Sequence, residues 1–593
     1  MRSLSCRHQH LALTAIILSV GAWVAALYGF QRVYAQTLSP YMPETMPLLP
    51  LVPFPTMYVA PDGSDETGDG SFYSPFLTIS KALSQADSGD VIDCRDGHYF
   101  EPEGIRFRRP GITLQSHTGE WAVIQAPHDD EENAPIAVYL DVNASHCTLR
   151  RLEIIGGYYY GISTETKWDW GDPNDRSGSS QILIEDCIVH DTGRDCIKIK
   201  PNCDDITIRR CEIYNSGRIY PPGETDGNAE GIDNVNGDFV RVQDCYIHDT
   251  FSTGIYFKGG ATCGVVERCR IENCGEAGVL VGFDTSPEYF DTRVNPKYYE
   301  NLYGIVRNCL IINTRYAGIG LYAAYGARIL NNTIINAAQE AHAALYFGVT
   351  FQDWEPEAGR PASTDAQFLN NLVLIPQTSD APAVSIRYAD ELGGLSGLKG
   401  LPDMNHNLYY YENGMARFED NRPGSQLESG DLAQWQTHIN GDAQSLEADP
   451  LLNADYTPTA NSPAIDNGGE TELVCFDLDY QGRKAPFDIG AKEYLISTGT
   501  NASVKKPMDF KLNIFPNPAQ DYLTVTWQNP GVDKVYLGLY NILGQRIMGP
   551  FTEIQGPGQQ QIRVNTKSIP NGLYFISLVS ANRHYIQKLS VCH

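Results

Sequence analysis

The chain has 593 residues, of which 72 are acidic and 44 are basic, so its formal net charge is −28. A chain of this length has room for several domains or for one long repetitive domain. A strongly acidic surface repels nucleic acid and anionic lipid, so we predict no nucleic-acid partner. The same charge disfavours an acidic polysaccharide as a partner unless the charge is inverted locally.

The first 35 residues have the pattern of an export signal. They begin with the basic stretch MRSLSCRHQH, continue with a long apolar run, and end with Val-Tyr-Ala before Gln36. This order is typical of a cleaved secretory signal. We therefore predict a signal peptide over residues 1–35 and a linker over residues 36–56. No later segment is long and apolar enough to cross a bilayer, so we expect no membrane span in the mature chain.

A short pattern recurs between residues 180 and 375. Its aligned copies include ILIEDCIVHDTG, ITIRRCEIYNSG, VRVQDCYIHDTF, GVVERCRIENCG and GIVRNCLIINTR. One position of this alignment is always a cysteine: Cys187, Cys211, Cys245, Cys269 and Cys309. Short alternating strands at a period of about two dozen residues, with Gly and Asn at the corners, predict an all-β parallel β-helix. We expect this domain to span residues 57–495, with neighbouring coils about 4.8 Å apart.

The repeat predicts ladders of like side chains. The cysteines are expected to pack as small buried hydrophobic groups, because their Cβ atoms lie slightly too far apart for good disulfide geometry. Four residues after each cysteine comes a polar residue that we expect to satisfy backbone groups in a turn. These residues are Asp191, Asn215, Asp249, Asn273 and Asn313. His190 and His248 precede two of them, so we favour a structural role for both histidines over a catalytic one.

The ends of the repetitive domain also have recognisable sequences. An amphipathic segment near Leu77–Gln85 is expected to form a helix that covers the open end of the core. The other end is closed by the segments DPLLNADYTPTANSPAIDNGG and DIGAKEY. These terminal segments resemble those that flank right-handed β-helix domains of bacterial exported proteins. The polar stretch 496–510 is predicted to be a linker.

Residues 511–593 are predicted to form a separate small β domain, a β-sandwich of alternating strands with Pro, Gly and Asn turns. The domain contains the segments FPNP, LYNILGQ and PNGLY in this order. These motifs resemble the C-terminal sorting domain of type IX secretion substrates. The resemblance implies that the type IX secretion machinery is a partner and that the protein is secreted or held at the outer-membrane surface. It implies nothing about activity.

Positions 8, 11 and 13 after the ladder cysteines, counted without the insertion that follows Cys211, are expected to point outward from the helix. In three neighbouring coils they carry charged and polar groups, whereas the coils beyond carry Leu, Gly and Ala. The outward group consists of Asp195, Glu230, Asp233, Tyr256, Lys198, Lys200 and Lys258. Long insertions nearby are expected to wall a binding groove. Trp168 and Trp170 in the first insertion could stack on sugar rings, or they could pack their loop onto the body.

These three coils resemble polysaccharide lyases of family nine, in which a right-handed β-helix binds calcium beside a catalytic lysine. The matching elements are DCIKIK at 195–200, AEGID at 229–233 and GIYFKGG at 254–260. The resemblance implies that Ca²⁺ is the cofactor. The implied calcium ligands are Asp195, Glu230 and Asp233, and the implied base is Lys258.

The chain departs from the family pattern in two places. One aspartate of the middle element is Ala229, and the lysine is displaced by two positions, which leaves Tyr256 where the family's base would fall. Both side chains are expected to point the same way, so both stay candidates. The predicted catalytic residues are Lys258, Tyr256 and Lys200, and the predicted substrate contacts are Lys198, Trp168 and Trp170.

A uronate lyase removes the proton on C5 and expels the group on C4, so it needs positive charge for the enolate, a base, and a proton for the leaving oxygen. Calcium takes six to eight oxygen ligands, and carboxylates on adjacent coils could share one ion. Such an ion would let an acidic protein bind a polyanion. A lysine acts as a base near neutral pH only if its pKa is lowered by about 2–3 units. We predict a secreted, monomeric lyase that cleaves a uronate-containing polysaccharide by calcium-assisted β-elimination.

Two alternatives stay open. A glycoside hydrolase needs two carboxylates about 5–9.5 Å apart. Asp233 could form such a pair with Asp195 or Glu230, although the chain has no paired-Asp element like that of the polygalacturonases. The other alternative is a non-catalytic surface protein that binds glycan, because a fold alone does not imply an activity. Only a lyase would create a carbon–carbon double bond in its product.

Overall fold

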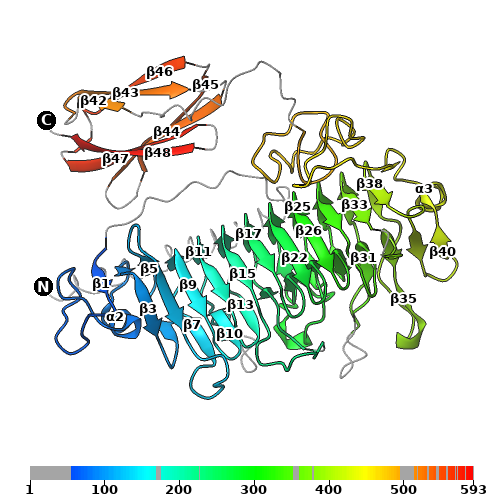
Figure 1. The fold of residues 1–593 in the computed structure, drawn as a ribbon, viewed down its shortest axis with the longest axis horizontal. Coiled ribbons are helices and arrows are strands. Elements are labelled where there is room, and N and C mark those ends of the chain that lie inside the picture. The colour runs from blue at the N-terminus through cyan, green and yellow to red at the C-terminus, as the bar shows by residue number, and fades with distance from the viewer. Residues whose placement is uncertain are drawn as a thin grey trace, which may run out of the picture.

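The structure is a computed structural model of the chain. It describes residues 55–494 except 169–174, 226, 351–358 and 377–378, and residues 513–591 except 517–518, 530–532, 542–545, 556–557, 568, 571 and 581–582. The predicted signal peptide and the predicted linker at 496–510 lie outside the described residues. Three sheets of 12 strands each wind into one long helix, which runs from blue to yellow in Figure 1.

Each coil of the helix adds one parallel strand to each sheet, so the strand order follows the sequence. The exception is the C-terminal end of one sheet, where the last strand is antiparallel to its neighbour. The first sheet contains β1 (Met57–Val59), β2 (Val91–Cys94), β5 (Thr113–Ser116), β8 (Thr148–Arg150), β11 (Leu183–Glu185), β14 (Thr207–Arg209), β17 (Arg241–Gln243), β21 (Val265–Glu267), β25 (Ile305–Arg307), β29 (Arg328–Leu330), β32 (Gln367–Leu369) and β37 (Asp403–Asn405). The second sheet, called the site sheet below, contains β4 (Ile105–Phe107), β7 (Ile136–Leu140), β10 (Tyr160–Thr164), β13 (Asp195–Ile199), β16 (Ile232–Val235), β19 (Ile255–Lys258), β23 (Val279–Val281), β27 (Ile319–Tyr322), β31 (Leu345–Gly348), β34 (Val384–Ile386), β39 (Phe418–Asp420) and β40 (Leu427–Gly430). The third sheet contains β3 (Gly97–Phe100), β6 (Ala122–Gln125), β9 (Leu152–Ile155), β12 (Ile188–His190), β15 (Glu212–Tyr214), β18 (Tyr246–His248), β22 (Arg270–Cys274), β26 (Leu310–Thr314), β30 (Thr333–Ile335), β33 (Leu372–Ile375), β38 (Leu408–Tyr411) and β41 (Leu446–Glu447).

Shorter elements lie at the corners. They are the strands β20 (Ala261–Thr262), β24 (Asn301–Leu302), β28 (Ala324–Tyr325), β35 (Tyr388–Ala389) and β36 (Leu395–Ser396), and the 3₁₀ turns η1 (Pro287–Tyr289) and η3 (Asp390–Leu392). Insertions enter the helix at such corners, so they leave the register of the three long sheets intact.

The core of the helix consists of stacked apolar columns. Ile197, Ile232 and Ile255 are Cα partners on consecutive strands of the site sheet, and Val279 and Ile319 continue the column. All five side chains are fully buried. Side chains alternate between the two faces of a strand, so the residues on either side of this column must point outward. The predicted inward column and its register are confirmed.

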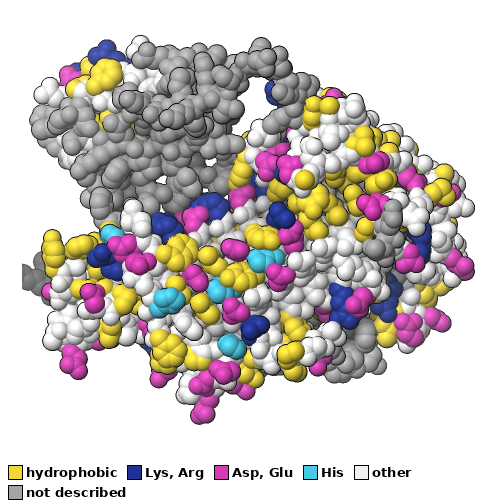
Figure 2. Space-filling model, viewed as in Figure 1, with side chains coloured by type: hydrophobic (Ala, Val, Ile, Leu, Met, Phe, Trp, Pro, Cys, Tyr) yellow, Lys and Arg dark blue, Asp and Glu magenta, His cyan; other side chains and the backbone are white. Residues whose placement is uncertain are grey.

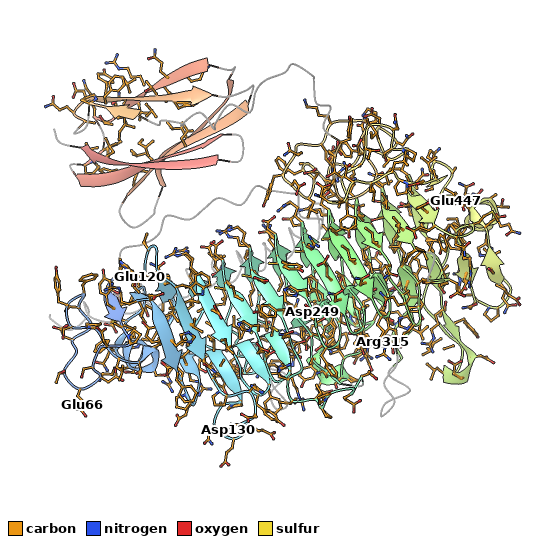
Figure 3. All side chains as sticks on the ribbon, in the orientation of Figure 1. Glu66, Glu120, Asp130, Asp249, Arg315 and Glu447 are labelled. Atoms are coloured by element: carbon orange, nitrogen blue, oxygen red, sulfur yellow. The ribbon has the colours of Figure 1, made fainter. Side chains whose placement is uncertain are left out.

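The corner ladders follow the predicted pattern. Asp191, Asn215 and Asp249 adopt left-handed backbone conformations with φ near 50°, which Asn and Asp tolerate better than most residues. The Asn215 amide donates to Asp191 Oδ1 at 3.4 Å, and the Asn273 amide donates to Asp249 Oδ1 at 3.0 Å. Figure 3 shows Asp249 midway along the helix. The ladder cysteines are free buried thiols, as predicted.

Both histidines that precede the ladder have structural contacts. His190 stacks on Tyr214 with the ring centroids 4.6 Å apart, and Tyr214 stacks in turn on His248 at 4.9 Å. His190 Nδ1 also lies 2.7 Å from Asp191 Oδ2. These residues belong to the third sheet and are not part of the site described below. The predicted structural role of both histidines is therefore confirmed.

Helices cover both ends of the core. The predicted N-terminal helix is α2 (Ile79–Gln85), whose cap Thr78 accepts a hydrogen bond from Lys81 N and which buries Ile79, Ala82 and Leu83. At the other end, α3 (Leu432–Ile439) begins with a capping box at Asp431. It buries Trp435 against Phe418 of the last coil, with ring centroids 5.4 Å apart. The apolar faces of the terminal coils are thereby kept from water.

The C-terminal segment forms two antiparallel sheets. The first contains β42 (Asn513–Phe515), β43 (Tyr522–Asn529) and β46 (Gly558–Asn565), and the second contains β45 (Arg546–Gln555), β44 (Asp533–Asn541), β47 (Gly572–Ser580) and β48 (Arg583–Val591). Side chains from both sheets, among them Val525, Trp527, Leu539 and Ile576, share one apolar core. This is the predicted small β-sandwich.

Within the described residues, no helix is long and apolar enough to span a bilayer. Figure 2 shows acidic side chains spread over one face of the β-helix with basic side chains among them. The negative charge is thus distributed over this face and is not gathered into one patch.

Candidate functional site

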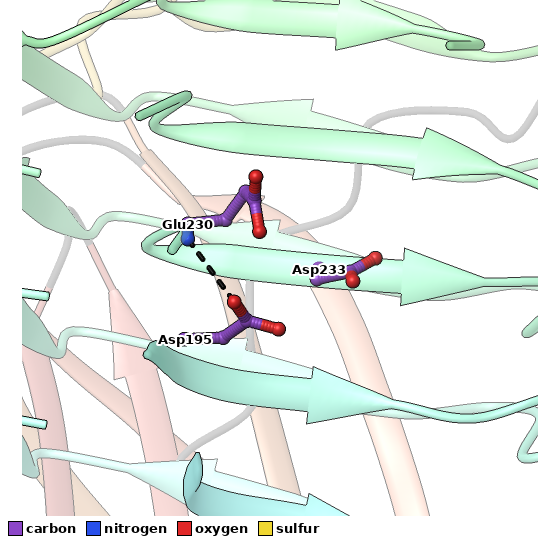
Figure 4. Close-up of side chains that lie close together, drawn as sticks. All are labelled: Asp195, Glu230 and Asp233. Carbon is purple, nitrogen blue, oxygen red and sulfur yellow. Dashed lines mark hydrogen bonds between the residues drawn. The ribbon is translucent and has the colours of Figure 1, made fainter. Parts of the chain in front are cut away.

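Three buried carboxylates lie together on the outer face of the site sheet. Asp195 begins β13, Glu230 precedes β16 by two residues, and Asp233 lies within β16. Cys196 N donates to Glu230 O at 3.0 Å, which places Glu230 beside Asp195 on the next coil. One carboxylate oxygen of each residue lies within 4.8 Å of those of the other two (Figure 4). The predicted juxtaposition of these residues, called the acidic cluster below, is confirmed.

The acidic cluster is closed to solvent. Asp195 and Asp233 are 0% exposed and Glu230 is 3% exposed. Glu230 N donates to Asp195 Oδ1 at 3.2 Å, and Ser252 Oγ donates to Glu230 Oε1 at 2.9 Å. Burial, reinforced by the charge of Asp195, raises the pKa of Glu230 well above its ordinary value. The cluster therefore favours a bound cation or a proton.

Two oxygens of the cluster lack hydrogen bonds. Among the described residues, no donor reaches Asp195 Oδ2 or Asp233 Oδ1 within hydrogen-bonding distance. An unpaired buried carboxylate oxygen is costly. Oxygen ligands at this spacing suit a hard divalent cation such as Ca²⁺, so the residues present fit such an ion.

Lys198 also belongs to the cluster. It is the Cα partner of Asp233 on the neighbouring strand, and its ammonium group pairs with the Asp233 carboxylate and lies 3.6 Å from Asp195 Oδ2. Burial lowers the pKa of Lys198 to about 8. The sequence predicted Lys198 as a substrate contact, whereas the side chain turns back onto the two aspartates.

Lys258 and Tyr256 lie on the next coil, in β19. Tyr256 is the Cα partner of Asp233, and Val235 is the partner of Lys258. Lys258 Nζ donates to Tyr256 Oη at 3.0 Å and lies 4.2 Å from the centroid of the Tyr256 ring. Burial, followed by the charge of Glu230, raises the pKa of Tyr256 well above its ordinary value. Tyr256 is 1% exposed and Lys258 is half-buried, so Lys258 is the more accessible of the two candidate bases.

Asn228 joins Tyr256 to the acidic cluster. With its amide oriented to satisfy its neighbours, its nitrogen donates to Tyr256 Oη and to both Glu230 carboxylate oxygens, each at 3.2 Å. Asn228 was not predicted from the sequence. Its position directly before the AEGID element was the available signal. The residue falls in an insertion, however, where the repeat does not predict which way a side chain points.

The remaining predicted residues lie outside the cluster. Lys200 Nζ pairs with Glu165 Oε2 at 2.8 Å on the preceding coil. Trp168 is 4% exposed, and its Nε1 donates to Glu288 O at 3.1 Å. The Arg176 guanidinium lies 3.6 Å from the centroid of the Trp168 ring. Trp168 therefore packs two insertions together, the alternative that the sequence left open, and Trp170 lies outside the described residues.

Glu300 holds the turn that follows Lys258. Gly259 and Gly260 have φ values of 70° and 92°, in the region that favours glycine. The fully buried carboxylate of Glu300 accepts from Gly259 N at 2.9 Å, from Thr285 Oγ1 at 2.7 Å and from Arg360 Nε at 2.8 Å. Glu300 was not predicted from the sequence, because it lies near the end of a long insertion and carries no periodic signal.

The pH dependence of protein stability tests the role of Glu300 in this turn. Burial, opposed by Arg360, raises the pKa of Glu300 from 4.5 to about 7. The folded state then binds more protons than the unfolded state between these pH values, so the contribution of Glu300 to stability falls as pH rises from 4.5 toward about 7. We expect Glu300→Gln to remove this slope.

Chemical denaturation of wild type and Glu300→Gln at several pH values measures the effect. The difference in unfolding free energy between the two proteins should change steadily across this window and level off above it. A difference that does not depend on pH would show that Glu300 does not titrate there.

The outer face becomes apolar beyond Tyr256. Leu280, Tyr322 and Tyr346 on the following coils form an apolar cluster with Tyr256, and Phe283 packs against it. Lys258 Nζ lies 5.8 Å from the centroid of the Phe283 ring. The acidic cluster, Lys198 and the Lys258–Tyr256 pair therefore all lie on the coils of β13, β16 and β19.

Three sheets wound into one helix, with a small antiparallel domain after them, define a parallel β-helix protein with an accessory C-terminal domain. The family model of the right handed beta helix region matches residues 225–373, and the model of the secretion system C-terminal sorting domain matches residues 513–592. The predicted handedness and the predicted sorting domain are confirmed. The protein is exported by type IX secretion to the cell surface or the extracellular space.

Solved structures with similar folds come from several enzymes. The pectate lyase Pel9A is 15% identical, with a TM-score of 0.45 over 75% of this chain and 97% of that chain. A rhamnogalacturonan lyase is 15% identical, with a TM-score of 0.42 over 60% and 87%. XylC, solved in complex with xylose, is 13% identical, with a TM-score of 0.41 over 86% and 99%. No curated protein matches the sequence. At these identities and TM-scores the activity of none of these enzymes transfers to this chain.

Proposed function

We propose that the protein is a secreted polysaccharide lyase that cleaves a uronate-containing polymer by calcium-assisted β-elimination. One observation carries the proposal. Adjacent rungs of one sheet bring a buried acidic cluster with two unsatisfied oxygens next to the Lys258–Tyr256 pair. A cation site beside an amine is the combination that removal of a proton next to a carboxylate requires.

Asp195, Glu230 and Asp233 would hold the calcium ion in this proposal. When bound, calcium supplies positive charge that neutralises a uronate carboxylate and the enolate that develops from it. The buried carboxylates contribute oxygen ligands from two coils at once. An acidic protein could thereby bind an acidic polymer, which the net charge alone disfavours.

Lys258 would act as the base. In its neutral form its Nζ takes the proton from C5, the electrons of the C–H bond form the C4–C5 double bond, and the bond from C4 to the leaving oxygen breaks. The proton then passes from Lys258 to the leaving oxygen, directly or through one water. Tyr256 is a positioning residue, because its hydroxyl accepts the 3.0 Å hydrogen bond that orients Nζ.

The test is a panel of uronate polymers incubated with the purified protein, with calcium or with a chelator. We expect ultraviolet absorbance from an unsaturated product on at least one polymer, and we expect chelation to abolish it. New reducing ends without absorbance would instead identify a hydrolase. Binding to a polymer without any cleavage would identify a glycan-binding protein.

A glycoside hydrolase is the second candidate, and one observation favours it. Lys198 pairs with Asp233, while burial and the charge of Asp195 raise the pKa of Glu230, which favours its protonated form. A protonated carboxyl beside an ionised one is the arrangement of a general acid and its partner carboxylate. The separation of the cluster oxygens, within 4.8 Å, is closest to the about 5–5.5 Å of retaining enzymes.

A further inference from the structure

We propose that Lys198 is a tethered cation that occupies the acidic cluster when no divalent ion is bound and must withdraw before an ion can bind. The inference rests on the metal site of the proposed function and adds the residue that controls when this site binds an ion. It concerns a residue of this chain that is neither a proposed ligand nor the proposed base.

The position of Lys198 supports this role. It lies in β13 between Asp195, three residues before it, and Asp233, its Cα partner on β16. Its ammonium group pairs with Asp233 and lies 3.6 Å from Asp195 Oδ2. The two carboxylates are fully buried, whereas the lysine side chain is 13% exposed. The lysine side chain is therefore less buried than the carboxylates that it contacts, so we expect an ion to enter on its side.

Charge explains why the cluster needs an occupant. Buried carboxylates without a compensating charge are costly. Lys198 supplies one positive charge, yet Asp195 Oδ2 and Asp233 Oδ1 still lack hydrogen bonds to any described residue. A divalent ion would coordinate such oxygens. It would repel an ammonium group only a few ångströms away, so the two cations compete for the same carboxylates.

The competition has a consequence for substrate binding. A displaced Lys198 ammonium can move only outward, because the interior of the coil is filled by Ile197 and Ile199. Withdrawal would therefore expose a positive charge beside the loaded site. Calcium binding would thus expose an ammonium group that a polyanion can bind. By linkage, binding of the polyanion to that group would strengthen calcium binding.

The test is a calcium titration by calorimetry on the full chain, with wild type, Lys198→Met, Lys198→Arg and Lys200→Met. Methionine keeps the apolar stem and removes the charge, so we expect at least about tenfold tighter calcium binding for Lys198→Met. Lys198→Arg, which keeps the charge, should bind calcium no more tightly than wild type. Lys200 pairs with Glu165 on the same face and does not contact the acidic cluster, so Lys200→Met should tighten calcium binding less than Lys198→Met does and is the comparison.

Thermal unfolding in a chelator gives a second readout. Lys198→Met should unfold at a lower temperature than wild type, because its buried carboxylates have lost their cation, and calcium should raise its unfolding temperature by more than that of wild type. If wild type binds calcium and Lys198→Met binds it no more tightly, the role of Lys198 is refuted while the metal site stands. If none of the four proteins binds calcium, the metal site itself is refuted, and this inference with it.

Discussion

Replacing Lys258 by methionine should lower the rate of unsaturated-product formation by about 10²–10⁴-fold, the contribution typical of a general base. The substitution keeps the apolar stem against the Tyr256 ring, 4.2 Å from Nζ in wild type, and removes only the amine. Calcium should still bind, because Lys258 is not a proposed ligand. The measurement is the initial rate of ultraviolet absorbance on the polymer that wild type degrades.

Tyr256→Phe separates the two candidates for the base. Phenylalanine keeps the ring and removes the hydroxyl that accepts from Lys258 Nζ at 3.0 Å, so we expect a smaller loss than for Lys258→Met. Lys200→Met is a comparison variant that tests whether the loss of another lysine from this face also lowers the rate of product formation. If Tyr256→Phe is inactive and Lys258→Met keeps most of the activity, the base is Tyr256 and not Lys258.

Replacing Glu267 by glutamine should lower the free energy of unfolding by about 3–5 kcal/mol, the cost of removing one partner from a buried ion pair. Glu267 ends β21 of the first sheet, and its side chain is 2% exposed. It accepts from Arg307 Nε at 2.7 Å and pairs with Arg268 Nη2 at 3.1 Å. Against the effect of burial, Arg307 and Arg268 hold the pKa of Glu267 below its ordinary value.

The Glu267 network also fastens the segment that follows the last coil. Arg307 Nη1 donates to Leu473 O at 2.5 Å, so losing the carboxylate loosens both the coil and the segment packed on it. Urea denaturation measures the effect. Glu340→Gln is a matched control, because Glu340 pairs with Arg315 at 2.6 Å but its side chain is 57% exposed. Exposed pairs contribute about 0–1 kcal/mol. Equal losses for the two variants would contradict the prediction.

Much of the fold followed from the repeat. The cysteine position set the register of the five coils that carry it, and a period of two along each strand then determined which side chains point inward and which point outward. The repeat therefore predicts that Asp195, Glu230, Asp233, Tyr256 and Lys258 lie on one face. The sorting domain could also be predicted from the sequence, and the model of the secretion system C-terminal sorting domain matches residues 513–592.

The repeat does not predict where the ends of long side chains lie. The repeat predicts where a Cβ atom lies, but a lysine has several rotatable bonds, and its charged end goes where the local field directs it. Lys198 and Lys200 therefore turned to Asp233 and to Glu165, and neither simply faces a groove. The Trp168 ring likewise packs against the guanidinium group of Arg176, which belongs to the same loop.

The sequence by itself determined the β-helix, its register, the face that carries the acids and the amine, and the route of export. Only the tertiary structure decided which cation sits among the acids and which residues hold the lysine turn. The physical reason is that stacking of coils is periodic and can be extrapolated along the chain. Asn228 and Glu300, in contrast, come from insertions, whose contacts are long-range and obey no period.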